Sequence, residues 1–230
     1  MFPIGDDDVR GAGLPWLSWG LIGANVLVFL YELTLGMEEL QEFFMIYGVV
    51  PVTILRGEQL FSLFTSMFLH GGWAHILSNM VFLWVFGDNI EATLGKVGYF
   101  VFYIVGGLAA SAMHILFNVN GEIPSLGASG AVAAILGAYV VMFPRSRVRV
   151  LLIFGFFARV TLVTALIFVG IWFVTQLFNG VASLGPATAQ TGGVAYWAHV
   201  GGFVFGAIIG ALFRHRAPEL ERDRRYRRRI

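Results

Sequence analysis

Residues 196–213 read YWAHVGGFVFGAIIGALF, a stretch without a single acidic residue, lysine or arginine. Roughly 20 apolar residues are enough to span a bilayer as a helix. Within the stretch, Gly202, Gly206 and Gly210 recur at every fourth position. This spacing puts the glycines on one helical face, where the backbone of a second helix can approach closely. The stretch therefore predicts a membrane helix with one close-packed face.

The rest of the chain has the same apolar character. Of its 230 residues, 57% are hydrophobic and only 13% are charged, against about 25% charged residues in soluble domains. We therefore expect an all-α polytopic membrane protein, folded as a bundle of six transmembrane helices. The expected spans cover about residues 16–35, 74–86, 97–117, 129–143, 161–178 and 196–213.

These spans divide the chain into three parts. Residues 1–15 form an N-terminal segment, residues 16–213 the membrane domain, and residues 214–230 a basic tail. Inside the membrane domain, a long loop at about 36–73 is rich enough in phenylalanine and leucine to be interfacial or partly inserted. The apolar run 151–157 is too short to span, and we place it at the interface or at the start of the fifth helix.

Lysine and arginine are distributed unevenly over the segments between the spans. Residues 118–128 and 179–195 contain neither, whereas residues 144–160 contain four arginines and residues 214–229 contain eight. Short cytoplasmic loops of membrane proteins are enriched in these two residues. Both termini are therefore predicted to be cytoplasmic. The basic tail either lies against anionic lipid or serves only as a topology signal.

This orientation brings several polar residues to one depth. The second, fourth and sixth spans all enter from the non-cytoplasmic side. Their first turns carry His75 and Asn79, then Ser129, and then His199. Polar groups inside a membrane are costly and are functional candidates for that reason. The fourth span also has a run of small residues from Gly130 onward, so it can pack closely on the sixth. We predict one shared polar pocket near the outer face.

A serine and a histidine at the same depth are a minimal set for acyl transfer. The Ser129 hydroxyl is the expected nucleophile, and the His199 imidazole is its expected general base. The oxyanion that forms needs hydrogen-bond donors. The side chains of His75 and Asn79 and the backbone N–H groups at Ser129 are the candidates. No carboxylate has a spacing that ties it to His199, so we expect a dyad rather than a triad.

Other hydrolytic chemistries lack the residues that they require. The chain has no cysteine, which excludes a thiol nucleophile, and it has neither an H-E-x-x-H motif nor a P-loop. We therefore expect no metal, no cofactor and no nucleotide. Nucleic acid is not an expected partner.

Four motifs resemble the rhomboid family of intramembrane serine proteases. In chain order they are HGGWAH at 70–75 followed by Asn79, FGDNIE at 86–91 followed by Gly95, GASG at 127–130, and AHVGG at 198–202 followed by Gly206. The resemblance covers about residues 15–213. It implies the minimal six-helix, bacterial-type form of the family, integral to a bacterial plasma (inner) membrane with both termini in the cytoplasm.

The resemblance also implies a role for each matching residue. Ser129 is implied as the nucleophile and His199 as the general base. His75 and Asn79 are implied to form the oxyanion hole with the Ser129 backbone. Small residues are implied to keep the site open and the helices close, at Gly127, Gly130, Gly202 and Gly206.

A transmembrane protein within the surrounding lipid is the implied substrate, cleaved near the outer face. In the family, the fifth span moves to admit it, which makes Trp172 and Phe173 gate candidates. A catalytically silent rhomboid-like adaptor that binds membrane proteins is the alternative function.

One position departs from the resemblance. Some bacterial members carry a tyrosine one turn after the nucleophile, where it stacks on the catalytic histidine. Here that position is Ala133, so another group must hold the ring of His199. We expect His70 to order the outer loop and Glu91 to anchor the turn after the second span.

Overall fold

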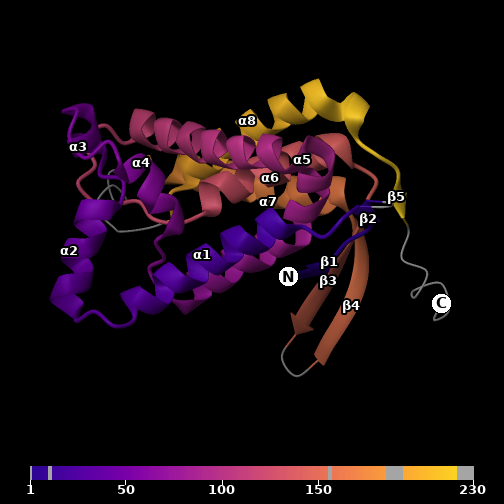
Figure 1. Cartoon of the computed structure of the whole chain (residues 1–230), viewed down its shortest axis with the longest axis horizontal. Coiled ribbons are helices and arrows are strands. Elements are labelled where there is room, and N and C mark those ends of the chain that lie inside the picture. Colours follow the sequence, from indigo (N-terminus) through magenta and orange to yellow (C-terminus); the bar gives the residue numbers. More distant parts are fainter. Residues whose placement is uncertain (1, 10–11, 155–156, 185–193, 222–230) are drawn as a thin grey trace.

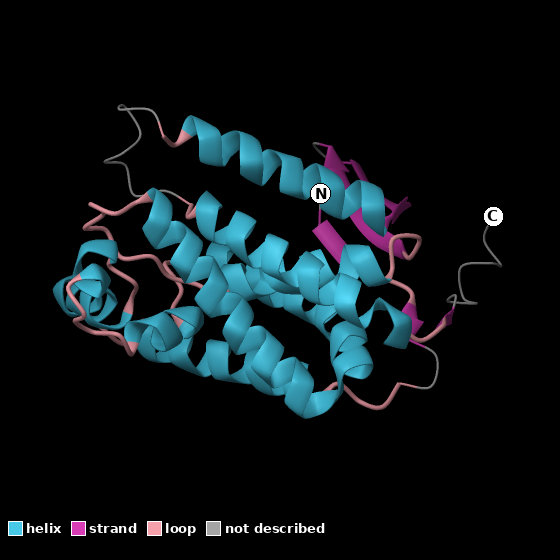
Figure 2. Cartoon of the chain, turned by 90° about the horizontal axis from the view of Figure 1, so that it is seen from above, coloured by secondary structure: helices cyan, strands magenta, loops and turns pink. Residues whose placement is uncertain are grey.

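The computed structural model describes residues 2–9, 12–154, 157–184 and 194–221. Most of this is helical (Figures 1 and 2). The main helices are α1 (Trp16–Glu32), α5 (Trp73–Phe117), α6 (Ser129–Met142), α7 (Ala165–Ala182) and α8 (Tyr196–Phe213). By length and composition, α5, α7 and the stretch Tyr196–Arg216 can cross a membrane, whereas α1 and α6 are apolar but shorter.

Helix α5 consists of two helices that meet at a glycine. Gly95 has φ 72° and ψ 164°, a backbone conformation that is nearly exclusive to glycine. The second and third expected spans are therefore the two halves of α5. The first half continues past Phe86, where the sequence predicts its end, because the polar residues that follow are buried and hydrogen-bonded. Asn89 and Glu91 are both almost fully buried.

Glu91 fastens α1 to α5. Its carboxylate accepts hydrogen bonds from the backbone N–H groups of Leu17 (3.1 Å) and Ser18 (2.8 Å) and from the Ser18 hydroxyl (2.8 Å). These backbone groups belong to the first turn of α1, where helical N–H groups have no partner within the helix. Glu91 is therefore structural, as predicted, but its hydrogen bonds hold the start of α1 rather than the turn after the second span.

The long loop at about 36–73 contains several short helices, which lie together at one end of the molecule (Figure 1). They are α2 (Met37–Tyr47), α3 (Pro51–Leu55), α4 (Ser62–Thr65) and the 3₁₀ helix η1 (Ser66–Phe68). Large apolar side chains on these helices are exposed, among them Met37 and Phe61. Such a surface suits an interfacial position.

The prediction of an all-α fold is wrong at the opposite end, where three antiparallel strands form a sheet in the order β1-β3-β4. Its strands are β1 (Phe2–Gly5), β3 (Arg147–Phe154) and β4 (Phe157–Thr164). In β3, the fully buried Val148 and Val150 alternate with arginines, which is the period of a strand rather than of a helix. The described part of the run 151–157 therefore belongs to a hairpin. It is not the start of the fifth helix, and α7 begins at Ala165 instead of near residue 161.

The N-terminal segment takes part in this end of the fold. The strand β2 (Asp8–Val9) pairs with β5 (Leu220–Glu221), which follows the 3₁₀ helix η2 (Arg214–Arg216). The pair of β2 and β5 therefore lies on the side opposite α2, α3 and α4 (Figure 1). The part of the basic tail after Glu221 lies outside the described residues.

Two buried aspartates hold the N-terminal segment in place. Asp6 accepts hydrogen bonds from the Asn89 amide (2.8 Å) and from the Tyr139 hydroxyl. Asp7 forms an ion pair with Arg147 at 3.0 Å. The segment is therefore joined to α5, to α6 and to the sheet.

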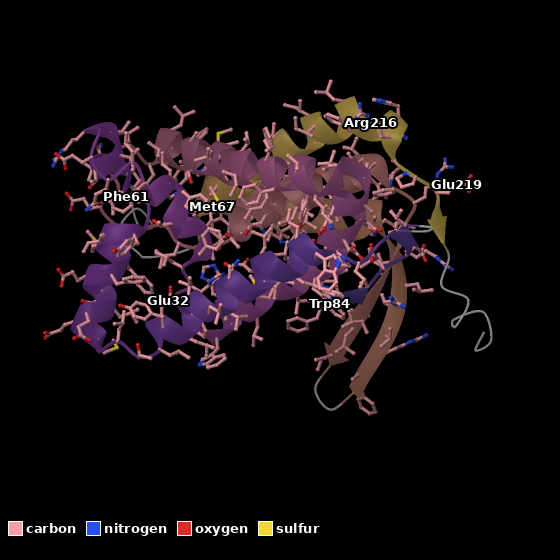
Figure 3. The ribbon with its side chains drawn as sticks, viewed as in Figure 1. Glu32, Phe61, Met67, Trp84, Arg216 and Glu219 are labelled. Atoms are coloured by element: carbon pink, nitrogen blue, oxygen red, sulfur yellow. The ribbon has the colours of Figure 1, made fainter. Side chains whose placement is uncertain are left out.

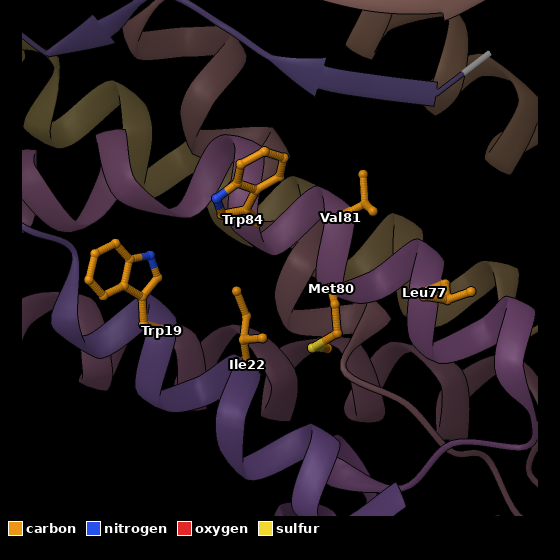
Figure 4. A pocket seen from close by; sticks show the side chains of 6 residues that line it. All are labelled: Trp19, Ile22, Leu77, Met80, Val81 and Trp84. Carbon is orange, nitrogen blue, oxygen red and sulfur yellow. The ribbon is translucent and has the colours of Figure 1, made fainter.

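Apolar side chains cover the outer faces of the helices. Trp84, which is 55% exposed, projects from α5 (Figure 3). Together with five others it lines a groove between α1 and α5 (Figure 4), whose remaining residues are Trp19, Ile22, Leu77, Met80 and Val81. A surface of this kind suits contact with lipid.

Candidate functional site

The predicted polar residues lie at the end of the bundle that carries α2, α3 and α4. His75 is in the first turn of α5, Ser129 is the first residue of α6, and His199 is in the first turn of α8. The backbone N–H of Gly127 donates to the carbonyl of Ser66 in η1 at 2.8 Å. The start of α6 is therefore tied to the segment that covers this end.

Gly127 lies directly against two side chains of α5. A Cβ atom at this position would lie 2.6 Å from Nε2 of His75 and 3.4 Å from Nδ2 of Asn79. The glycine also has a φ of 119°, which side-chain-bearing residues rarely adopt. The missing side chain thus lets two potential N–H donors lie against the backbone, two residues before Ser129.

Helices α6 and α8 approach at backbone distance, as the glycine spacing predicts. A Cβ atom at Gly202 would overlap the carbonyl oxygen of Gly130, and one at Gly206 would overlap that of Ala134. Because Gly130 follows Ser129 and Gly202 lies three residues after His199, this contact brings the starts of the two helices to the same level. The predicted close packing of these two helices is confirmed.

Ser129 and His199 differ in their exposure. The serine is partly exposed, whereas His199 is buried, with 7% of its surface accessible. Within the described residues, no hydrogen bond joins the Ser129 hydroxyl to the His199 ring, whose Nδ1 contacts another side chain. Catalytic hydrogen bonds are often long without substrate and shorten only in the Michaelis complex.

The ring of His70 contacts the Asn79 side chain. Nε2 of its buried ring lies 3.0 Å from the Asn79 amide nitrogen, Nδ1 lies 3.3 Å from the Phe68 carbonyl oxygen, and the His70 backbone N–H donates to Glu32. Burial, and then the neighbouring ring of His75, lowers the pKa of His70 to about 4. The ring is therefore neutral at pH 7, so Nδ1–H donates to Phe68 and Nε2 accepts from Asn79. The expected loop-ordering role of His70 is confirmed and extends to Asn79.

The partner of His199 was missed at the sequence level. Its Nδ1 lies 2.7 Å from Oε1 of Gln176 on α7, and the glutamine is itself buried. The ring of Trp172, one turn earlier on α7, lies 5.9 Å from the His199 ring. A carboxamide within an otherwise apolar span was the available signal.

The gate candidates pack between α7 and α8. The ring of Phe173 stacks on Phe203 with centroids 4.0 Å apart, and Trp172 lies 6.3 Å from the same ring. The described residues contain no group of three or more His, Cys, Asp or Glu side chains that could hold a metal ion. The polar groups of the candidate site are the Ser129 hydroxyl, imidazole rings such as that of His199, and carboxamides such as that of Gln176.

Comparison with known proteins decides the family. A family model described as the Rhomboid domain matches residues 57–216. The chain belongs to the rhomboid family. The resemblance based on the four motifs is thereby confirmed.

Curated relatives of this rhomboid come from several kinds of organism. Rhomboid protein 1, mitochondrial, of Saccharomyces cerevisiae is 28% identical over 217 residues, which are 91% of this chain and 56% of the yeast protein. Presenilin-associated rhomboid-like protein A, mitochondrial, of Danio rerio is 30% identical over 128 residues, or 53% of this chain and 33% of that protein. Rhomboid protease GluP of Bacillus subtilis is 28% identical over 126 residues, or 55% of this chain and 24% of GluP.

This rhomboid spans 56% or less of the length of each of these three relatives. The family is membrane-integral and has both mitochondrial and bacterial members. It includes proteases such as GluP and also inactive rhomboid-like proteins.

Proposed function

We propose that this rhomboid is an intramembrane serine endopeptidase, which hydrolyses peptide bonds of transmembrane proteins near the outer face of the membrane. The observation that carries the proposal is the close approach of two potential donors to the Gly127 backbone. His75 Nε2 and Asn79 Nδ2 lie 2.6 Å and 3.4 Å from the position that a Cβ would take, two residues from a partly exposed serine. Preorganised N–H donors at the place where negative charge develops are the main requirement of acyl transfer.

The proposed topology has six spans. They are α1, the two halves of α5, α6, α7 and α8, with residues 16–213 as the membrane domain and both termini in the cytoplasm. The arginines of β3 and of η2 then lie at the cytoplasmic leaflet, where anionic lipids attract them. This charge distribution suits the plasma membrane of a bacterium.

In the proposed reaction, the Ser129 oxygen bonds to the carbonyl carbon of the scissile peptide while Nε2 of His199 takes the hydroxyl proton. The carbonyl oxygen becomes an oxyanion that His75, Asn79 and the backbone N–H at Ser129 stabilise. The C–N bond then breaks, and the imidazolium gives its proton to the leaving amine. Water, activated by the same imidazole, hydrolyses the acyl-enzyme and restores Ser129.

Replacing the nucleophile tests the proposal. Ser129→Ala should abolish cleavage of a transmembrane substrate in liposomes and labelling by a serine-directed fluorophosphonate, because no oxygen remains to form the acyl-enzyme. Ser78→Ala is a matched control, since the Ser78 hydroxyl is exposed and donates only within its own helix, to the His75 carbonyl. It should retain both activities.

Two results would contradict the proposal. One is equal cleavage by the wild-type protein and Ser129→Ala. The other is a well-folded wild-type protein that is never labelled, which would favour the catalytically silent adaptor.

A further inference from the structure

We infer that Gln176 is the positioning residue for the general base: its carbonyl oxygen accepts the Nδ1–H of His199 and so leaves Nε2 free to take the serine proton. The inference rests on the proposed function and names the group that takes the place of an aromatic ring at position 133. Ala133 is fully buried, and a Cβ at Gly202 would already lie 3.4 Å from its side chain. Alanine carries no ring, so another group has to orient His199.

The orientation of the Gln176 amide follows from its other contacts. Its Nε2 lies 3.2 Å from Oγ1 of Thr175 and 3.4 Å from the Trp172 carbonyl oxygen. The Thr175 hydroxyl donates its own proton to the same carbonyl at 2.6 Å, so its oxygen is left to accept. A flipped amide would set Oε1 against the Trp172 carbonyl, two acceptors facing each other. The oxygen of Gln176 therefore faces His199, and the atom opposite it must be an N–H.

This contact fixes the tautomer of His199. In a neutral imidazole one ring nitrogen is a donor and the other an acceptor. With Nδ1 donating to Gln176, Nε2 carries the lone pair that a general base needs. Since both side chains are buried, with 7% and 8% of their surfaces accessible, bulk water does not replace a lost partner. An imidazole held in the wrong tautomer cannot act as the base.

The contact also joins the base to α7. Gln176 lies one turn after Trp172, whose ring is 5.9 Å from His199. The helix that carries the gate candidates therefore carries the oxygen that orients the base as well. A displacement of α7 that separates the two side chains would remove the acceptor that fixes the tautomer of His199. The imidazole would then be a poor base until the helix returns.

The first experiment reads the tautomer in the wild-type protein and needs no substitution. Histidine is labelled with ¹⁵N, the protein is reconstituted in liposomes, and the His199 signals are assigned by their loss in His199→Ala. Near neutral pH the spectrum should show a protonated Nδ1 and an unprotonated Nε2. A neutral ring with its proton on Nε2 would overturn the inference, whether or not the protein proves to be a protease.

The second experiment removes the acceptor. Gln176→Met has a side chain of the same length without the carbonyl oxygen. It should lower kcat for a transmembrane substrate by about 10- to 100-fold, the size expected for losing a hydrogen bond to a group that becomes charged, with KM nearly unchanged. The Nδ1–H signal of His199 should become weaker. Gln176→Glu keeps an acceptor at this place and should retain the tautomer and more of the activity than Gln176→Met.

Asn179→Leu removes the second carboxamide of α7 and is the matched control, which should leave kcat and the tautomer unchanged. Equal kcat in Gln176→Met and the wild-type protein would overturn the inference while the proposed function stands. An equal loss in the Met and Glu variants, with an unchanged tautomer, would also overturn it and assign Gln176 to packing alone. Failure of the proposed function is distinct, because it would appear as cleavage that does not depend on Ser129.

Discussion

At the scale of single residues, Gly127 is the position where one added carbon tests the proposed oxyanion hole. The Cβ of Gly127→Ala would lie 2.6 Å from Nε2 of His75, so the ring of this proposed oxyanion donor would have to move away. Removing one such donor from an enzyme typically costs about 10²–10³ in rate. We expect Gly127→Ala to lower cleavage and fluorophosphonate labelling by about this factor.

The control for this substitution is Gly71→Ala. Nothing lies within 4 Å of a Cβ at Gly71, although this glycine also lies two residues before a helix of the site, α5. It should cleave and label at the wild-type rate. A wild-type rate in Gly127→Ala would show that the oxyanion lies elsewhere.

The candidate residues differ in how far the sequence could predict them. The sequence could predict four of them, because each is a polar group at the start of an apolar span and the loop charges set their common depth. These four are Ser129, His199, His75 and Asn79. Gln176 was missed because it lies near the end of its expected span, 161–178, rather than at the start, and no periodicity relates it to His199. Only the packing of α7 against α8 brings the two side chains together.

At the scale of elements, the backbone contact between α6 and α8 makes a prediction about stability. A Cβ at Gly206 would overlap the backbone carbonyl of Ala134, which cannot move aside as a flexible side chain can. Overpacking of this kind costs roughly 1–3 kcal/mol. Gly206→Ala should therefore lower the unfolding temperature in detergent.

Gly170→Ala on α7 is the matched comparison for this change. Nothing lies within 4 Å of a Cβ at Gly170, and alanine is the better helix former. This variant should be as stable as the wild-type protein or slightly more stable. If Gly206→Ala unfolded at the same temperature as Gly170→Ala, the two helices would not be in backbone contact.

The elements themselves were predictable where the apolar runs were long. The expected span 196–213 matches α8, and the sequence also places the starts of α1 and α6 correctly. The strands were missed because their apolar character, read in a chain so rich in apolar residues, favoured membrane helices. Alternation over Arg147, Val148, Arg149 and Val150 was the signal for β3, and the burial of both valines shows which face of the strand packs inward.

At the scale of the whole molecule, the N-terminal segment and the candidate site lie at opposite ends. The site is near α2, α3 and α4, whereas β1 and β2 belong to the end with the sheet (Figure 1). The sequence predicts residues 1–15 only as a cytoplasmic segment and contains no sign that its aspartates are buried. Asp6 and Asp7 are instead 4% and 5% exposed. Their partners are far away in the sequence, so local patterns could not predict this burial.

This separation predicts that stability and catalysis can be changed independently. Asp6→Ala removes the acceptor of the Asn89 amide and of the Tyr139 hydroxyl. The Tyr139 hydroxyl keeps Ser146 as an acceptor (2.7 Å), whereas the Asn89 amide keeps, within the described residues, only the Asp7 carbonyl (3.1 Å) and has one N–H left over. Leaving a buried donor without an acceptor costs about 1–3 kcal/mol, so the free energy of unfolding should fall by about this amount. The rate of cleavage per folded molecule should stay at the wild-type value, since the contacts around Ser129, Gly127 and His199 are untouched. Unfolding in detergent and titration of active sites with the fluorophosphonate measure the two quantities separately.

The control is Glu58→Ala, which removes an exposed carboxylate. It should change neither the free energy of unfolding nor the rate of cleavage per folded molecule. A loss of rate per folded molecule in Asp6→Ala would mean that the sheet end is coupled to the site through the bundle, and the independence argued from their separation would be wrong.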